Sequence, residues 1–307
     1  MAVKVYKHTD PGAPPHPSDT RGSMATLLRA CLVTGYYLGE DITPPAGWEE
    51  VFESMNNFAV FRSLVGSMQI YQLDDNMPDD DVAYMRACES LASVDAATTG
   101  EWAQNYFGKQ YPGYAQWTVI ADEKTCYVIL QSMYGNIIHG FGEFDSAVVE
   151  DPHNSFLAGH TYSDNLPSDN LHYAGMHYAN ALGQSGYIET HRTATGTFAG
   201  NGKIVEVADI VYPGGLSNVS PVAQANNDLG FYTSPVYISM DSAQEGGLKL
   251  IRGKLRGIYQ PLAQYPKSHL EEYIDSETGK TMMCVTYGND GSSSYQGSYM
   301  FDITGPW

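Results

Sequence analysis

The chain has 307 residues, 43% of them hydrophobic and 17% charged, the composition of a folded protein with room for one large domain or two ordinary ones. Acidic residues outnumber basic ones by 35 to 16, which gives a formal net charge of −19. Nucleic-acid binding draws much of its affinity from basic side chains that release counterions, so this balance argues against direct nucleic-acid binding.

Cysteine usage and hydropathy indicate where the protein is made. The cysteines are far apart and none forms a CxxC pair, which fits reduced thiols rather than a disulfide framework. They are Cys31, Cys88, Cys126 and Cys284. No segment reaches the roughly 18 apolar residues of a membrane span, and the first residues lack the apolar region of a signal peptide. We expect synthesis in a cytoplasm and no membrane partner.

The first predicted elements are a short strand at residues 3–6 and a proline-rich stretch at residues 10–17, which we group as an N-terminal arm over residues 1–20. Ordering such an arm costs about 1–2 kcal/mol of backbone entropy per residue, so we expect something to hold it. Two alternatives are open: the arm lies along its own domain, or a neighbouring subunit clamps it.

Residues 22–48 predict an amphipathic helix followed by a stiff turn. Ser23 can cap the helix and Gly35 can end it, and two prolines and Gly47 then fix the position of Trp48. Apolar residues at helical spacing share one face: Met24, Leu27, Leu28, Cys31 and Leu32. We expect this face to pack on the chain's own sheet.

Further elements complete an α+β domain over residues 21–150. Alternating residues at 58–64 and 67–73 predict a hairpin. The acidic cluster at 79–81 suits the positive end of a helix dipole, so we predict a second helix that starts there and ends before residue 98.

Strand patterns dominate from residue 115 onward. Residues 151–202 are predicted to be mostly loop and to form the boundary to a β-rich domain at 203–307, built as a β-sandwich or an irregular barrel. The fold class is thus α+β and β-rich, with few short helices near the N-terminus. Strands are predicted at residues 117–121, 125–130, 137–144, 203–212, 235–240, 248–259, 281–287 and 297–303.

A series of short motifs runs in order from the predicted helix to residue 262. They are residues 23–36 (SMATLLRACLVTGY), 45–48 (PAGW), 60–63 (VFRS), 71–78 (YQLDDNMP), 89–95 (ESLASVD), 117–130 (WTVIADEKTCYVIL), 140–146 (GFGEFDS) and 252–262 (RGKLRGIYQPL). In this order they resemble a family of virion structural proteins of tailed bacteriophages. The resemblance implies synthesis in the host bacterial cytoplasm, a place in the virion, and other copies of the chain and neighbouring virion proteins as partners.

Candidate chemistry is sparse. His172 and His177 are five residues apart, not the i, i+4 spacing of a helical zinc pair, so we expect the histidines of this region to hydrogen-bond in loops or to titrate at a subunit contact. Neither Ser67 nor Ser185 stands in a GxSxG motif. Acidic runs that could serve a glycosidase lie at residues 74–75, 79–81 and 271–272, although neighbouring acids more often form a solvated face.

A basic strip occupies the predicted strand at residues 248–259. In an extended strand Arg252, Lys254 and Arg256 project from one face. Either local acidic residues balance this face within the fold, or it pairs with acidic residues of another subunit. We take these three residues and Trp48 as the candidate interface.

The sequence therefore predicts a non-enzymatic structural protein of a phage particle, with no catalytic residues, no metal and no cofactor. Its place, in the tail, baseplate, collar or capsid surface, is left open. Two alternatives are a receptor- or glycan-binding virion module, for which the tyrosine-rich loops are candidates, and a virion-associated hydrolase.

Overall fold

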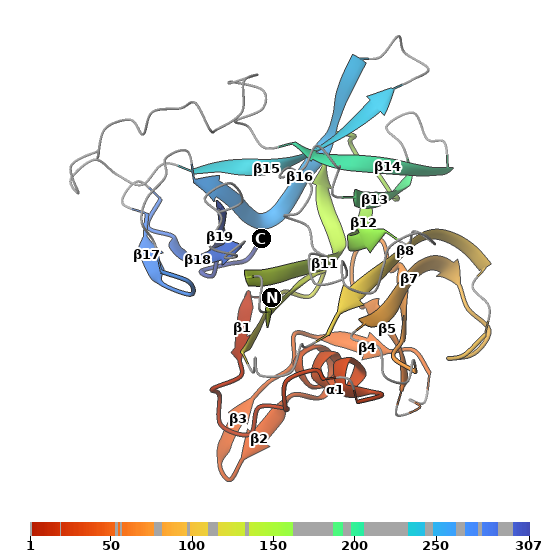
Figure 1. The fold of residues 1–307 in the computed structure, drawn as a ribbon. Coiled ribbons are helices and arrows are strands. Elements are labelled where there is room, and N and C mark those ends of the chain that lie inside the picture. The colour runs from red at the N-terminus through yellow and green to blue at the C-terminus, as the bar shows by residue number, and fades with distance from the viewer. Residues whose placement is uncertain are drawn as a thin grey trace.

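The computed structural model describes residues 2–18, 20–52, 55, 57–76, 82–96, 99–109, 116–132, 135–161, 187–192, 198–205, 233–242, 248–261, 268–275, 278–287 and 297–307. Over these residues the protein is β-rich, as predicted (Figure 1). The elements before the middle of the chain are β1 (Lys4–Lys7), α1 (Ser23–Arg29), a π-helix (Ala30–Thr34), β2 (Tyr36–Leu38), β3 (Asp41–Thr43), β4 (Trp48–Glu50), β5 (Phe58–Ser63), β6 (Ile70–Asp74), β7 (Val82–Ser90), β8 (Thr99–Gly108), β9 (Trp117–Ala121) and β10 (Thr125–Ser132). Those that follow are β11 (Gly135–Ser146), β12 (Ser155–Thr161), β13 (Tyr187–Arg192), β14 (Phe198–Val205), β15 (Thr233–Ser242), β16 (Leu248–Pro261), β17 (Glu272–Ile274), β18 (Thr281–Tyr287) and β19 (Gly297–Asp302).

The paired strands are antiparallel and follow chain order closely. Strands β4 to β8 form one meander, and β9 to β16 form a second. Strand β16 also pairs with β11, which closes β11 to β16 into a barrel. Strand β12 pairs with β8 and so joins the meanders, while β1 pairs with β9, and β17, β18 and β19 extend from β16. Strands β2 and β3 form a separate two-stranded sheet.

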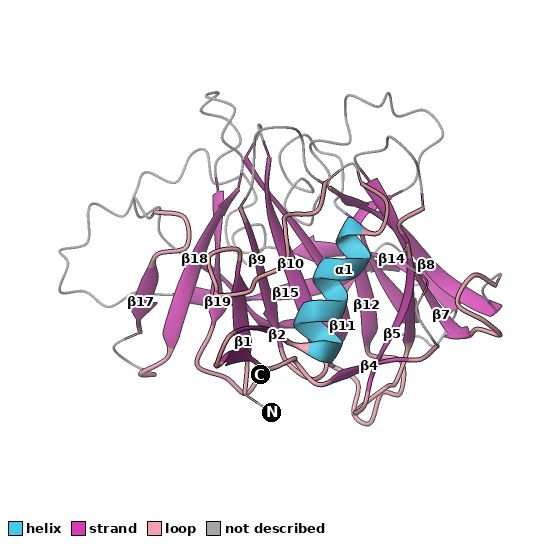
Figure 2. Ribbon diagram, turned by 90° about the horizontal axis from the view of Figure 1, so that it is seen from below, coloured by secondary structure: helices cyan, strands magenta, loops and turns pink. Residues whose placement is uncertain are grey.

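The central strands are buried on both faces because each face lines a different core. Along β9, Val119 contributes to one core and Ile120 to the other, and along β10 Val128 and Ile129 divide in the same way. The first core contains α1 and residues of β4 to β8, and the second contains residues of β16, β18 and β19. Figure 2 shows α1 lying over the strands of the first core. These strands therefore read as continuous apolar runs rather than alternating ones.

A helix begins at Ser23, where the sequence predicts one, and continues as the π-helix to Thr34. Its five predicted core residues are fully buried: Met24, Leu27, Leu28, Cys31 and Leu32. The predicted cap is wrong, because Ser23 Oγ bonds to the carbonyl of Ser18 instead. Asp75, at the end of β6, accepts the backbone N–H groups of Met24 (2.8 Å) and Ala25 (3.3 Å), so a residue far along the chain satisfies the helix end.

The second predicted helix is wrong. Residues 82–90 form β7, which pairs with β6 on one side and with β8 on the other. Backbone pairing on two sides outweighs the local helical pattern, a case of tertiary context deciding strand formation. The acidic cluster at residues 79–81 lies outside the described residues.

The prediction that residues 151–202 are mostly loop is also wrong where the structure describes them. Strands β12, β13 and the start of β14 fall in this range and carry the hydrogen-bonded sheet from β11 to β15. Glycine and polar residues, which read as loop signals, are accommodated because neighbouring strands supply the backbone partners.

The N-terminal arm lies along its own domain, the first of the two alternatives. The backbone N–H of His8 bonds to the carbonyl of Trp117, and the Trp117 indole N–H bonds back to the carbonyl of Pro14 (3.2 Å). Tyr36 donates its hydroxyl to Asp10 at 2.6 Å. Contacts within the chain thus hold the described part of the arm.

His269 links pH to stability where β11 approaches β18. The Asn136 side-chain amide donates to the Thr286 carbonyl (2.6 Å) and to Nδ1 of His269 (3.1 Å), so His269 accepts here as a neutral ring. Burial lowers the pKa of His269 from 6.5 to about 4. The unfolded chain therefore takes up a proton at a higher pH than the folded one, and the stabilisation present above pH 6.5 is lost as pH falls toward 4.

We expect His269 to lower the free energy of unfolding by about 1–2 kcal/mol at pH 5 relative to pH 8. The measurement is urea unfolding of the wild type and of His269→Gln at both pH values. Other groups titrate in both proteins, so the difference between them isolates His269. Equal pH dependence in the two proteins would rule out this role.

Candidate functional sites

The basic strip of β16 does not project from one face as predicted. Arg252 and Arg256 are buried at 2% and 7% exposure, whereas Lys254 is exposed. The pairing of β16 with β15 is irregular in two places. One irregularity lies between Ile251 and Gly253, and the other lies between Lys254 and Tyr259. These bulges turn the two arginines inward and leave Lys254 outside.

Acidic residues of the same chain neutralise both arginines. Arg252 pairs with Asp151 and lies over the Phe144 ring, 5.0 Å from its centroid. Arg256 pairs with Asp122 at 2.9 Å and also donates to the carbonyl of Trp307. The intramolecular alternative therefore holds for Arg252 and Arg256, which corrects their assignment to an interface.

Trp48 is likewise internal. Its indole is 3% exposed, donates to the Asp122 carbonyl at 2.8 Å and packs edge-on against Phe141. The prolines and glycine before it do place the ring at a defined point, but that point is the first core. Of the predicted interface residues only Lys254 stays exposed, and its role at an interface stays a prediction.

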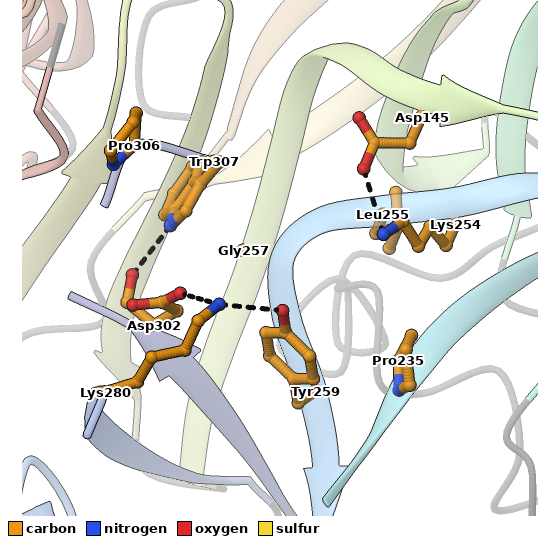
Figure 3. Close-up of a pocket in the computed structure, with 10 residues that line it drawn as sticks. All are labelled: Asp145, Pro235, Lys254, Leu255, Gly257, Tyr259, Lys280, Asp302, Pro306 and Trp307. Atoms are coloured by element: carbon orange, nitrogen blue, oxygen red, sulfur yellow. Dashed lines mark hydrogen bonds and ion pairs between the residues drawn. The ribbon is translucent and has the colours of Figure 1, made fainter. Parts of the chain in front are cut away.

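A small pocket of about 150 Å³ opens beside the bend of β16 (Figure 3). Its walls combine apolar side chains with two lysine–aspartate pairs. Lys280 contacts Asp302 at 2.6 Å and Tyr259 at 3.5 Å, and Lys254 contacts Asp145 at 3.3 Å. The lining residues are Asp145, Pro235, Lys254, Leu255, Gly257, Tyr259, Lys280, Asp302, Pro306 and Trp307.

A hydrogen bond to Asp302 holds the Lys280 ammonium group at the pocket. Burial is the largest single influence and lowers the pKa of Lys280, but the hydrogen bonds and charges of Asp302 and Tyr259 together outweigh it, so the pKa is raised overall. Asp302 itself is 2% exposed, and its second oxygen accepts the backbone N–H of Thr304. The pocket therefore presents the Lys280 ammonium rather than the Asp302 carboxylate.

Histidines meet at a second place. The Nδ1 atoms of His153 and His191 lie 3.0 Å apart, and Nε2 of His191 lies 3.1 Å from a carboxylate oxygen of Glu89. Trp102 packs against His191, with ring centroids 5.3 Å apart. This network joins β7, β8 and β13: His153 hydrogen-bonds from a loop, as expected, whereas His191 does so from a strand. His172 and His177 lie outside the described residues.

The acidic runs considered for a glycosidase have structural roles where they are described. Asp75 is buried, caps α1 and pairs with Lys109 at 2.8 Å. Glu272 pairs with Lys7 at 3.3 Å, and Glu271 accepts the backbone N–H of Ser268. These carboxylates are thus engaged within the chain.

The β2–β3 hairpin exposes large apolar side chains at the edge of the molecule (Figure 1). Tyr37 is 75% exposed, Leu38 62% and Ile42 76%, and Tyr37 lies directly opposite Ile42. Gly39, at φ +64°, begins the two-residue turn at the tip, and Glu40 follows it. Sequence reasoning missed this surface, although the pattern of apolar residues around Gly39-Glu40 is a hairpin signal.

An isolated two-stranded hairpin is marginally stable in water, so its base needs support. Tyr36 anchors it, being 6% exposed and in contact with Tyr6. The base is therefore fixed while the tip projects.

No group of three or more metal-ligating side chains occurs among the described residues. In the same part of the chain, no helix is both long and apolar enough to cross a membrane. Comparison of the sequence with protein-family models and with curated proteins gives no match.

Proposed function

We propose that the protein is a non-enzymatic structural component of a tailed-bacteriophage virion, which acts by binding other protein chains and needs no cofactor. The ordered motifs from residue 23 to residue 262 support the place in a particle. The β2–β3 hairpin carries the proposal of assembly, because a projecting element with three large exposed apolar residues is typical of a protein-binding surface.

Binding to a partner would stabilise the hairpin by removing its apolar side chains from water. Complete burial of a large apolar side chain is worth about 1.5–3 kcal/mol, and Tyr adds a polar tip that suits an interface. Leu38 and the Tyr37–Ile42 pair would all contribute. A contact made through this hairpin would also satisfy its unpaired strand edges.

We also propose that the chain keeps the predicted two-part organisation, an α+β part before residue 151 and a β-rich part, sandwich-like or barrel-like, toward the end. The first core supports this division, because nearly all of its residues precede residue 151, whereas the second core joins β9, β10 and β11 to the later strands. A single unfolding transition by calorimetry would indicate that the two parts fold as one unit.

The proposal of a virion role is tested by the composition of purified particles. Mass spectrometry should find the chain in fixed copy number in particles that have been washed free of lysate. Absence from such particles would overturn the virion role.

The hairpin is tested by Tyr37→Thr combined with Ile42→Thr, which keeps strand propensity but removes apolar area. We expect incorporation into particles to fall about tenfold or more, with thermal unfolding little changed because both residues are exposed. Ile274→Thr on β17 is the matched control, since Ile274 is 74% exposed but lies outside the hairpin. Equal incorporation of both variants would show that the hairpin has no role in assembly.

A further inference from the structure

We infer that the pocket beside β16 is a carboxylate-binding site, and that its occupant is the acidic tip of the β2–β3 hairpin from a second copy of the chain. This inference rests on the proposed assembly function and names the partner. The pocket is lined mainly by residues of β15, β16 and β19, and Figure 1 shows the β2–β3 hairpin away from these strands, so the contact is head-to-tail.

The pocket has hydrogen-bond donors to spare. An ammonium group carries three N–H donors. Lys280 uses one on Asp302 and a second, at 3.5 Å, on Tyr259, while Lys254 uses one on Asp145. Further N–H groups of both lysines are therefore free to bind an acceptor in the pocket.

Asp302 is more fully engaged than the lysines of the pocket, whereas the Asp145 side chain is 47% exposed. Both oxygens of Asp302 are engaged and its side chain is 3% exposed. Asp145 faces Lys254 at 3.3 Å and Arg256 at 3.7 Å. The pocket contains two lysines and two aspartates, so an incoming carboxylate would be bound by the remaining N–H groups of the lysines and not by a net positive charge.

The hairpin tip offers the complementary chemistry. Glu40 and Asp41 are exposed, and neither side chain forms a hydrogen bond or an ion pair with any described residue. Leu38 stands next to them, 62% exposed, and Pro235, Leu255 and Pro306 line the pocket. Carboxylates would meet lysines while apolar side chains meet apolar walls.

Charge also decides between the two ways of joining copies through this hairpin. Two hairpins placed tip to tip would bring four carboxylates together, which is unfavourable. A hairpin placed in the pocket joins opposite charges. Such a contact uses different surfaces on the two copies, so it produces a closed ring or a growing chain.

The test mixes two variants of the full chain. Glu40→Lys with Asp41→Lys removes the acidic groups of the hairpin tip and leaves the pocket intact. Lys254→Glu spoils the pocket and leaves the tip intact, and it was chosen over Lys280 because Lys254 is exposed and Asp302 keeps its partner. Analytical ultracentrifugation then measures association of each variant and of a 1:1 mixture.

We expect the wild type to associate and each variant alone to associate at least about tenfold more weakly. The mixture should associate again, because the intact tip of one variant meets the intact pocket of the other. Salt should weaken the wild-type contact. Glu150→Lys, also at an exposed acid, is the matched control and should associate like the wild type.

Three outcomes would overturn the inference. A mixture that stays monomeric while the wild type associates would exclude the tip-to-pocket contact, and so would variants that associate like the wild type. A wild type that stays monomeric but binds glucuronate in a Lys254-dependent way would assign the pocket to acidic sugars. None of these depends on whether the chain is found in purified particles, so the virion role is judged separately.

Discussion

Lys109→Met is expected to lower the free energy of unfolding by about 3–5 kcal/mol. The Lys109 and Asp75 side chains are fully enclosed, 2.8 Å apart. Methionine fills similar space but leaves the Asp75 carboxylate buried without its cation. Burial raises the pKa of Asp75, and Lys109 together with the two helix N–H groups opposes that rise. Asp75 caps α1, so the loss extends to the helix that covers the first core.

The measurement is denaturant unfolding at pH 7, with Lys7→Met as the control. Lys7 pairs with Glu272 at the surface, where their side chains are 32% and 48% exposed. Loss of this ion pair should cost less than about 1 kcal/mol. Adding Asp75→Asn to Lys109→Met should recover part of the stability, because a neutral amide oxygen still accepts from the helix. Similar effects of Lys109→Met and Lys7→Met would contradict the account of a buried pair.

Arg256→Met is expected to have a comparable effect on stability, about 3–5 kcal/mol, without changing how folded molecules associate. Its partner Asp122 is 2% exposed and also accepts the backbone N–H groups of Lys124 and Thr125, each at 2.8 Å. Losing the guanidinium would leave this carboxylate buried at the turn between β9 and β10. Burial and the nearby Arg256 act in opposite directions on the pKa of Asp122, and burial dominates.

Lys254→Met is the matched comparison on the same strand. Because Lys254 is exposed, we expect a loss of less than about 1 kcal/mol in stability but weaker association of copies. Calorimetry and ultracentrifugation on both variants separate the two effects. If Arg256→Met kept full stability and lost association, Arg256 would belong to an interface after all.

Local patterns in the sequence predicted many of the elements. Alternating residues gave the pairing of β5 with β6, and the apolar runs gave β9 and β10 on either side of the turn at 122–124. The helical spacing of Met24 to Leu32 indicated which face is buried. These features depend on residues close in sequence, whose periodicity is fixed by backbone geometry.

Long-range contacts explain the errors. Residues 82–90 carry a helical pattern, yet pairing with β6 and β8 makes them a strand. The basic strip of β16 follows strict alternation in the sequence, whereas bulges against β15 turn Arg252 and Arg256 inward. Neither the neighbouring strands nor the bulges can be read from the segment itself.

By itself the sequence determined that the chain is β-rich and acidic and that one amphipathic helix near the N-terminus covers a sheet. Only the tertiary structure decided which charged side chains form ion pairs inside the fold and which remain exposed. Arg252 and Arg256 are neutralised by Asp151 and Asp122, which are distant in sequence, while Lys254 and the β2–β3 hairpin stay exposed. Burial and charge pairing depend on which strands become neighbours, and that is settled by the whole chain at once.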